Sequence, residues 1–185
     1  MDAAAKMKST PSARTGKRPP AKFELRDAFA ISHYDLRKAP HRPHRKFLDA
    51  VTIGHVLNKA RIARNEKLLE EAGKALELTH RDLKDQVESI TKEFSGDKLA
   101  PAAGAPPVQA TTFDVPWDDR RYWLLVRMVL LLEEGNQKLS RLMNTGAIDH
   151  DEMKRRQREL ARPFRAVLQK IVNLAAERAA KGSKE

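Results

Sequence analysis

The side chains of this chain most able to do chemistry are the lysines and arginines of its first 46 residues. Twelve Lys and Arg stand there against four Asp and Glu, a balance of +8 within the +11 of the whole chain. A cationic segment joined to a nearly balanced body is typical of proteins that bind a polyanion. Double-stranded DNA is the commonest such partner, and RNA and acidic membrane follow.

Neutralising phosphates is the chemistry expected of this segment, because each contact releases counterions and makes binding salt-dependent. The residues that we expect to contact DNA phosphates are Lys17, Arg18, Arg37, Lys38, Arg42, Arg45 and Lys46. A solubilising tail without a partner is the alternative interpretation.

Residues 22–32 alternate between apolar and other side chains, with Phe23, Leu25, Phe29 and Ile31 at the odd positions. Such a period of two predicts a half-buried strand. A two-stranded ribbon formed between two subunits can enter the DNA major groove and present one face to the bases. That face would carry the predicted base contacts, which are Lys22, Glu24 and Arg26. An ordinary edge strand and the first turn of a helix are the competing interpretations.

A second basic cluster lies near the C-terminus, in the string DEMKRRQRELARPFR. The residues of this secondary patch are Lys154, Arg155, Arg156, Arg158 and Arg162, with Arg165 close behind. The cluster could contact the DNA backbone or an acidic partner. Charge runs of this kind on a helix are usually a solvated face, and we favour that interpretation.

No catalytic arrangement is found, and we expect neither enzymatic activity nor a cofactor. The chain has no phosphate-binding loop, no dinucleotide-binding glycine pattern and no G-x-S-x-G motif. His41 and His44 form an H-x-x-H pair, but basic and proline neighbours favour a contribution to the basic patch over metal binding.

The location that we expect is cytoplasmic, without contact to a membrane. The chain lacks cysteine, and its N-terminus lacks an apolar signal region. The longest apolar run, residues 122–132, is too short to span a bilayer and is interrupted by Arg127. We expect Arg127 to lie on the exposed line of its helix.

The elements that must position these residues are mainly helical. Residues 1–21 are predicted to be a disordered basic arm, and residues 22–94 a strand followed by one long helix from about residue 44, for DNA binding and dimerisation. Apolar residues at a spacing of seven, among them Leu69, Leu76 and Leu83, indicate a stripe packed against other helices of the chain. Gly54 is the one candidate turn.

The second half predicts a linker and a helical hairpin. Residues 95–116, rich in Pro, Gly and Ala, are expected to form the linker. Residues 117–176 are expected to form the C-terminal hairpin, and residues 177–185 a polar tail. The expected caps and breaks are Asp118 or Asp119 at the first helix, Gly146 at its end, Asp149 at the second start, and a kink or split at Pro163.

Five strings carry a resemblance to a known family: FELRDAFAISHY, LLEEAGKALELTHRDLKDQ, FDVPWDDRRYWLLVRMVLLLEEGNQKL, NTGAIDHDEM and RPFRAVLQKIV. In their order, over residues 22–175, the chain resembles the AcaB-like proteins of conjugative plasmids and integrative conjugative elements. The resemblance implies a regulator of transfer genes that binds DNA as a homodimer through an atypical ribbon-helix-helix module, with residues 22–32 as the ribbon.

The functional expectation is therefore a sequence-specific, homodimeric DNA-binding regulator of a mobile genetic element. A helical adaptor or structural protein with a basic tail is the first alternative, with a protein partner on the helical body. An RNA-binding protein ranks lower, because few aromatic residues lie near the basic segment.

Overall fold

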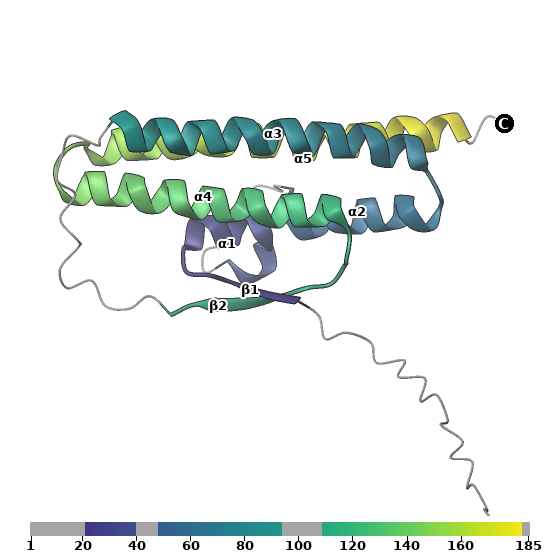
Figure 1. Ribbon diagram of the computed structural model, residues 1–185, viewed down its shortest axis with the longest axis horizontal. Coiled ribbons are helices and arrows are strands. Elements are labelled where there is room, and N and C mark those ends of the chain that lie inside the picture. Colours follow the sequence, from purple (N-terminus) through teal and green to yellow (C-terminus); the bar gives the residue numbers. More distant parts are fainter. Residues whose placement is uncertain (1–20, 40–47, 94–108, 183–185) are drawn as a thin grey trace, which may run out of the picture.

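The computed structural model describes residues 21–39, 48–93 and 109–182. This part of the chain is mainly helical with one short pair of strands, which confirms the predicted fold class. Figure 1 shows α3 and α5 side by side in an upper layer, α4 and α2 beneath them, and the two strands lowest, with α1 between α4 and the strands. The elements are β1 (Ala21–Leu25), α1 (Ala28–Tyr34), a 3-10 turn (Leu36–Lys38), α2 (Ala50–Ile62), α3 (Glu66–Glu93), β2 (Thr111–Val115), α4 (Arg120–Asn144) and α5 (His150–Gly182).

The predicted strand is correct only as far as Leu25. Asp27 ends it, because its carboxylate accepts a hydrogen bond from the Phe29 amide at 2.8 Å and so caps helix α1. The strand prediction for residues 28–32 is therefore wrong. The apolar alternation continued there because Ile31 and its neighbours are buried on one side of a short helix.

The partner of β1 is β2 of the same chain, in an antiparallel pair with Lys22 opposite Asp114. The predicted linker of residues 95–116 is wrong for the residues of β2. Phe113 of β2 is 2% exposed and stacks on Phe23, with ring centroids 5.6 Å apart. Pairing of β1 with a strand from a second subunit is not needed to form the ribbon.

The single long helix predicted from about residue 44 is also wrong, because two helices take its place. Arg64, between α2 and α3, has a φ of 53°, a left-handed conformation that interrupts helical geometry. Asn65 then caps α3 by accepting a hydrogen bond from the Leu68 amide at 3.1 Å. Gly54, the expected turn, lies inside α2.

Gly54 is required by close packing. A Cβ built on it would lie 2.3 Å from the Trp117 ring and 2.5 Å from the Tyr122 ring, closer than real Cβ atoms come. The glycine therefore lets α2 approach the start of α4.

Replacing Gly54 by alanine is expected to lower the free energy of unfolding by about 1–3 kcal/mol, the usual cost of overpacking a core. Gly73→Ala is the matched control, because a Cβ on that helical glycine has its nearest neighbour at 3.7 Å. The control is expected to gain about 0.5–1 kcal/mol from helix propensity. Urea unfolding of both variants measures the difference, and equal stabilities would contradict the packing argument.

The remaining helix predictions have mixed outcomes. Leu76 and Leu83 of the seven-residue repeat are fully buried, and α3 packs against α4 and α5 as expected. Asp119 caps α4, and Gly146 follows that helix with a φ of 74°. Helix α5 contains Pro163 without being split and continues to Gly182, so the predicted polar tail from residue 177 is largely helical.

Candidate nucleic-acid interface

β1 and β2 form a two-stranded antiparallel sheet, here called the β1–β2 ribbon, whose outer face carries two of the three predicted base contacts. Lys22 and Glu24 are exposed, whereas Leu25 is fully buried beneath them. The Lys22 Nζ of β1 lies 3.8 Å from the Asp114 carboxylate of β2, and both side chains are 65% exposed. An ion pair this exposed is weak. Lys22 therefore remains able to turn toward a ligand.

Arg26, the third predicted base contact, is exposed at the turn between β1 and α1. The backbone of this turn is held by Glu133 of α4, whose Oε1 accepts hydrogen bonds from the amides of Arg26 and Asp27, the latter at 2.9 Å. Glu133 is 9% exposed, and the two amides provide hydrogen-bond donors to its carboxylate inside the fold. A buried carboxylate thus fixes where the Arg26 side chain begins.

A chain of side-chain hydrogen bonds joins this turn to α5. The Asn136 amide of α4 donates to the Asp27 carboxylate, and the Gln157 amide of α5 donates to the Asn136 oxygen at 2.5 Å. Arg26 is thereby brought close to the N-terminal half of α5. The sequence contained no signal for the contact between Asp27 and Asn136, because these residues are 109 positions apart.

Arg37 and Lys38, two of the predicted phosphate contacts, are exposed and already engaged with neighbours. Arg37 holds the buried Asp35 carboxylate with two hydrogen bonds of 2.9 and 3.0 Å. Burial tends to raise the pKa of Asp35, but the hydrogen bonds from Arg37 hold that pKa below its usual value. The Lys38 ammonium lies 4.6 Å from the centroid of the Phe113 ring.

The other predicted phosphate contacts lie outside the described residues. They are Lys17, Arg18, Arg42, Arg45 and Lys46, and the same holds for His41 and His44.

The secondary basic patch divides into two groups. Arg155 forms ion pairs with Glu152 and Glu159 at 2.6 Å, and Arg156 with Glu152 at 2.6 Å and Glu93 at 2.9 Å. Hydrogen bonds from the two arginines lower the pKa of Glu152 to about 2. The charges of Arg155 and Arg156 are therefore matched by carboxylates of α5 and α3.

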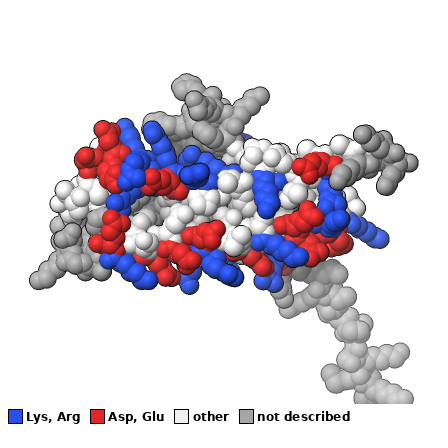
Figure 2. Space-filling model, turned by 90° about the horizontal axis from the view of Figure 1, so that it is seen from above, with Lys and Arg blue, Asp and Glu red and all other residues white. Residues whose placement is uncertain are grey.

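The second group is different, and we call it the α5 basic row: Lys154, Arg158, Arg162 and Arg165. Lys154, Arg158 and Arg162 are exposed, and none of the three forms an ion pair within residues 21–39, 48–93 and 109–182. Figure 2 shows Lys and Arg side chains gathered over the N-terminal half of α5, beside the acidic residues of its first turn. Arg165, which follows the predicted patch in the sequence, completes the row from its half-buried position.

His33 of α1 supports Arg165 from below. Its Nδ1 lies 2.8 Å from the Phe29 carbonyl oxygen and must donate to it, so Nε2 accepts from the Arg165 Nε at 3.3 Å. Burial lowers the pKa of His33 to about 4, and the positive charge of Arg165 acts in the same direction. His33 is therefore neutral at pH 7. Burial and the nearby charge of Arg158 also lower the pKa of Arg165.

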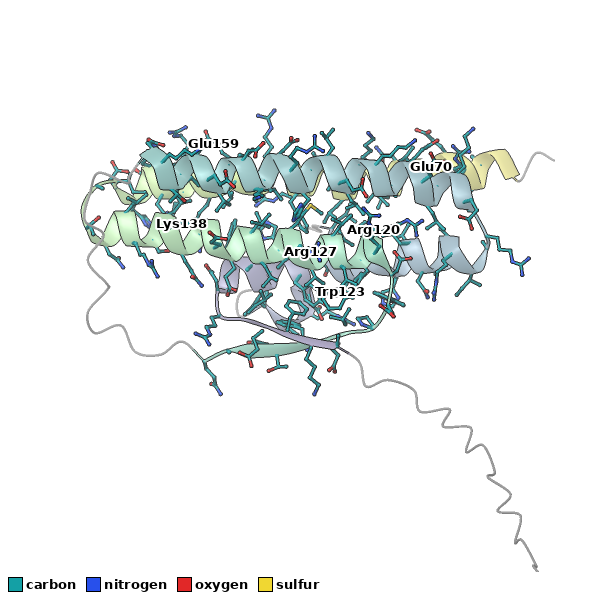
Figure 3. The ribbon with its side chains drawn as sticks, viewed as in Figure 1. Glu70, Arg120, Trp123, Arg127, Lys138 and Glu159 are labelled. Carbon is teal, nitrogen blue, oxygen red and sulfur yellow. The ribbon has the colours of Figure 1, made fainter. Side chains whose placement is uncertain are left out.

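Arg127 is exposed on α4, as the sequence suggested (Figure 3). Across the described ranges, no helix combines the length and apolar character needed to cross a membrane. The same part of the chain holds no group of three or more potential metal ligands. Comparison with known proteins finds no matching family model, curated protein or solved structure.

Proposed function

We propose that this protein is a sequence-specific DNA-binding regulator. The observation that carries the proposal is the position of the cationic N-terminal segment in the sequence. It immediately precedes the exposed Lys22 and Glu24 of the β1–β2 ribbon and Arg26 of the turn that follows β1. A major groove admits a two-stranded ribbon, and β1 with β2 provides one within a single chain. The basic segment supplies the salt-dependent part of binding.

Each of the three predicted base-contact residues has a hydrogen-bonding partner among the base edges of the major groove. Arginine pairs bidentately with guanine, which suits Arg26 at its fixed position. Glu24 can accept a hydrogen bond from the amino group of cytosine, and Lys22 can donate to guanine. Arg37 and Lys38, with the basic residues outside the described ranges, contact phosphates and set the register.

The place of this activity is proposed from the resemblance to AcaB-like proteins. The DNA sites would lie in transfer genes of a mobile genetic element. The regulator would be a homodimer that presents two β1–β2 ribbons to one operator.

The test is binding to genomic-fragment and random-sequence duplex DNA across a salt series. Wild type is compared with Lys22→Ala/Arg26→Ala and with a variant lacking residues 1–20. We expect wild type to select particular fragments at near-physiological salt, the double variant to lose that selection, and the truncated variant to bind more weakly at every sequence.

Lys74→Ala/Lys84→Ala is the charge-matched control, because both lysines are exposed on α3 and form ion pairs with the neighbouring Glu70 and Glu88. This control should retain fragment selection. Absence of fragment selection by wild type would refute the proposal of a sequence-specific regulator, and absence of all binding at low salt would remove DNA as the ligand.

A protein adaptor is the second candidate, favoured by large apolar side chains on the surface of the helical body. Ile62 is 72% exposed and Leu78 is 58% exposed. The adaptor function would be supported if the wild-type chain binds no DNA but binds a protein partner. Binding of that partner should then be lost in Ile62→Ser/Leu78→Ser.

A further inference from the structure

Three residues of the α5 basic row, Lys154, Arg158 and Arg162, carry positive charge that no ion pair with a described residue compensates. Arg155 and Arg156, one stripe away on the same helix, are matched by Glu93, Glu152 and Glu159. Lys154, Arg158 and Arg162 have no such ion pair with a described residue. Ion pairs within the fold therefore account for Arg155 and Arg156 but not for Lys154, Arg158 and Arg162.

The row is also linear and rigid. Its members follow one another at spacings of four, four and three residues, which places them on one stripe of an α-helix over roughly 16 Å. An open groove of about 470 Å³ runs beside Arg158, Arg162 and Arg165, with Glu159 and Ala166 as its other lining residues. Glu159 is held by Arg155.

Packing contacts and hydrogen bonds connect the row to the β1–β2 ribbon that we propose reads DNA. Helix α1 separates them by its own width: Tyr34 contacts the Phe23 ring of β1 with centroids 4.8 Å apart, and His33 contacts the Phe164 ring of α5 at 5.9 Å. Gln157, which immediately precedes Arg158, is linked through Asn136 to the turn that carries Arg26. These packing contacts and hydrogen bonds hold the row and the turn of Arg26 in a fixed relation to each other.

We propose that the α5 basic row is a second DNA-contacting surface, which binds phosphates of the same duplex whose bases the β1–β2 ribbon contacts. The proposal rests on the proposed function. A phosphate backbone suits the row better than a protein does, because protein interfaces need buried aromatic or aliphatic anchors, and Ala166 is the one apolar residue lining the groove. Exposed cations without an ion pair to a described residue, as at Lys154, Arg158 and Arg162, suit contacts to successive phosphates.

The test uses the full chain with Arg158→Gln/Arg162→Gln, which keeps helix propensity and removes two charges. Association with a selected fragment and with random duplex is measured between low and moderate salt. We expect the slope of log affinity against log salt to become shallower by about 2, with the preference for the selected fragment unchanged. Lys74→Gln/Lys84→Gln, which removes two charges that are paired on α3, should leave the slope as in wild type.

Three outcomes decide the matter. A shallower slope in the row variant alone supports a second phosphate-binding surface. A row variant that behaves like the control overturns it while the proposed DNA-binding function stands, and an acidic protein becomes the partner to seek. Wild-type protein that binds no DNA overturns both. Thermal unfolding of each variant checks that these exposed substitutions leave the fold intact.

Discussion

Replacing Glu133 by alanine is expected to lower the free energy of unfolding by about 3 kcal/mol. The substitution removes a buried charged acceptor from the amides of Arg26 and Asp27, and hydrogen bonds to charged groups contribute about 1.5–3 kcal/mol each. Both amides lie in the turn that joins β1 to α1, so the loss of stability should be largest there. Urea unfolding gives the total, and hydrogen exchange at these two amides locates it.

Glu134→Ala is the matched control for this prediction. Glu134 is the next residue on α4, is 53% exposed and pairs with Lys138 at 2.7 Å. An exposed pair of this kind contributes about 0.3–0.5 kcal/mol. Similar losses in the two variants would mean that Glu133 does not hold the turn.

Lowering the pH from 7 to 4 is expected to cost about 3 kcal/mol of stability through His33. Burial places its folded-state pKa at about 4, against an ordinary value of 6.5. Between these values the unfolded chain binds more protons at this residue than the folded chain, so stability rises with pH there. The contribution is complete above about pH 6.5 and is lost as the pH falls to about 4; the size follows from about 1.4 kcal/mol per pKa unit.

The measurement is the free energy of unfolding at several pH values between 4 and 7. His33→Gln should flatten the curve in this window, because glutamine cannot be protonated there. His150→Gln, an exposed position at the start of α5, should leave the curve as in wild type. A wild-type curve that His33→Gln leaves unchanged would show that other groups set the pH dependence.

Local signals in the sequence were sufficient for several parts of this protein. The mainly helical class follows from apolar periodicity, and the caps at Asp119 and Asp149 follow from residue types that accept hydrogen bonds from free amides. Gly146 takes the left-handed conformation that ends a helix. The outward side chains at Lys22 and Glu24 follow from strand alternation. All of these depend on a few neighbouring residues.

Tertiary contacts decided the rest. β2 was not predicted, because a strand of five residues is defined by a partner ninety positions away. Arg156 and Arg158 are chemically alike and two positions apart in the sequence, yet Glu93 of α3 neutralises the first, and no described carboxylate reaches the second. Sequence pattern alone was therefore enough for the mainly helical class, for several helix caps and for the distribution of positive charge, but not for α1 or for the break between α2 and α3. Pairs within α5, such as Arg155 with Glu152 and Glu159, follow from spacings of three and four residues along the helix. The pair of Arg156 with Glu93 depends on the packing of α5 against α3, because local sequence does not specify distances between helices.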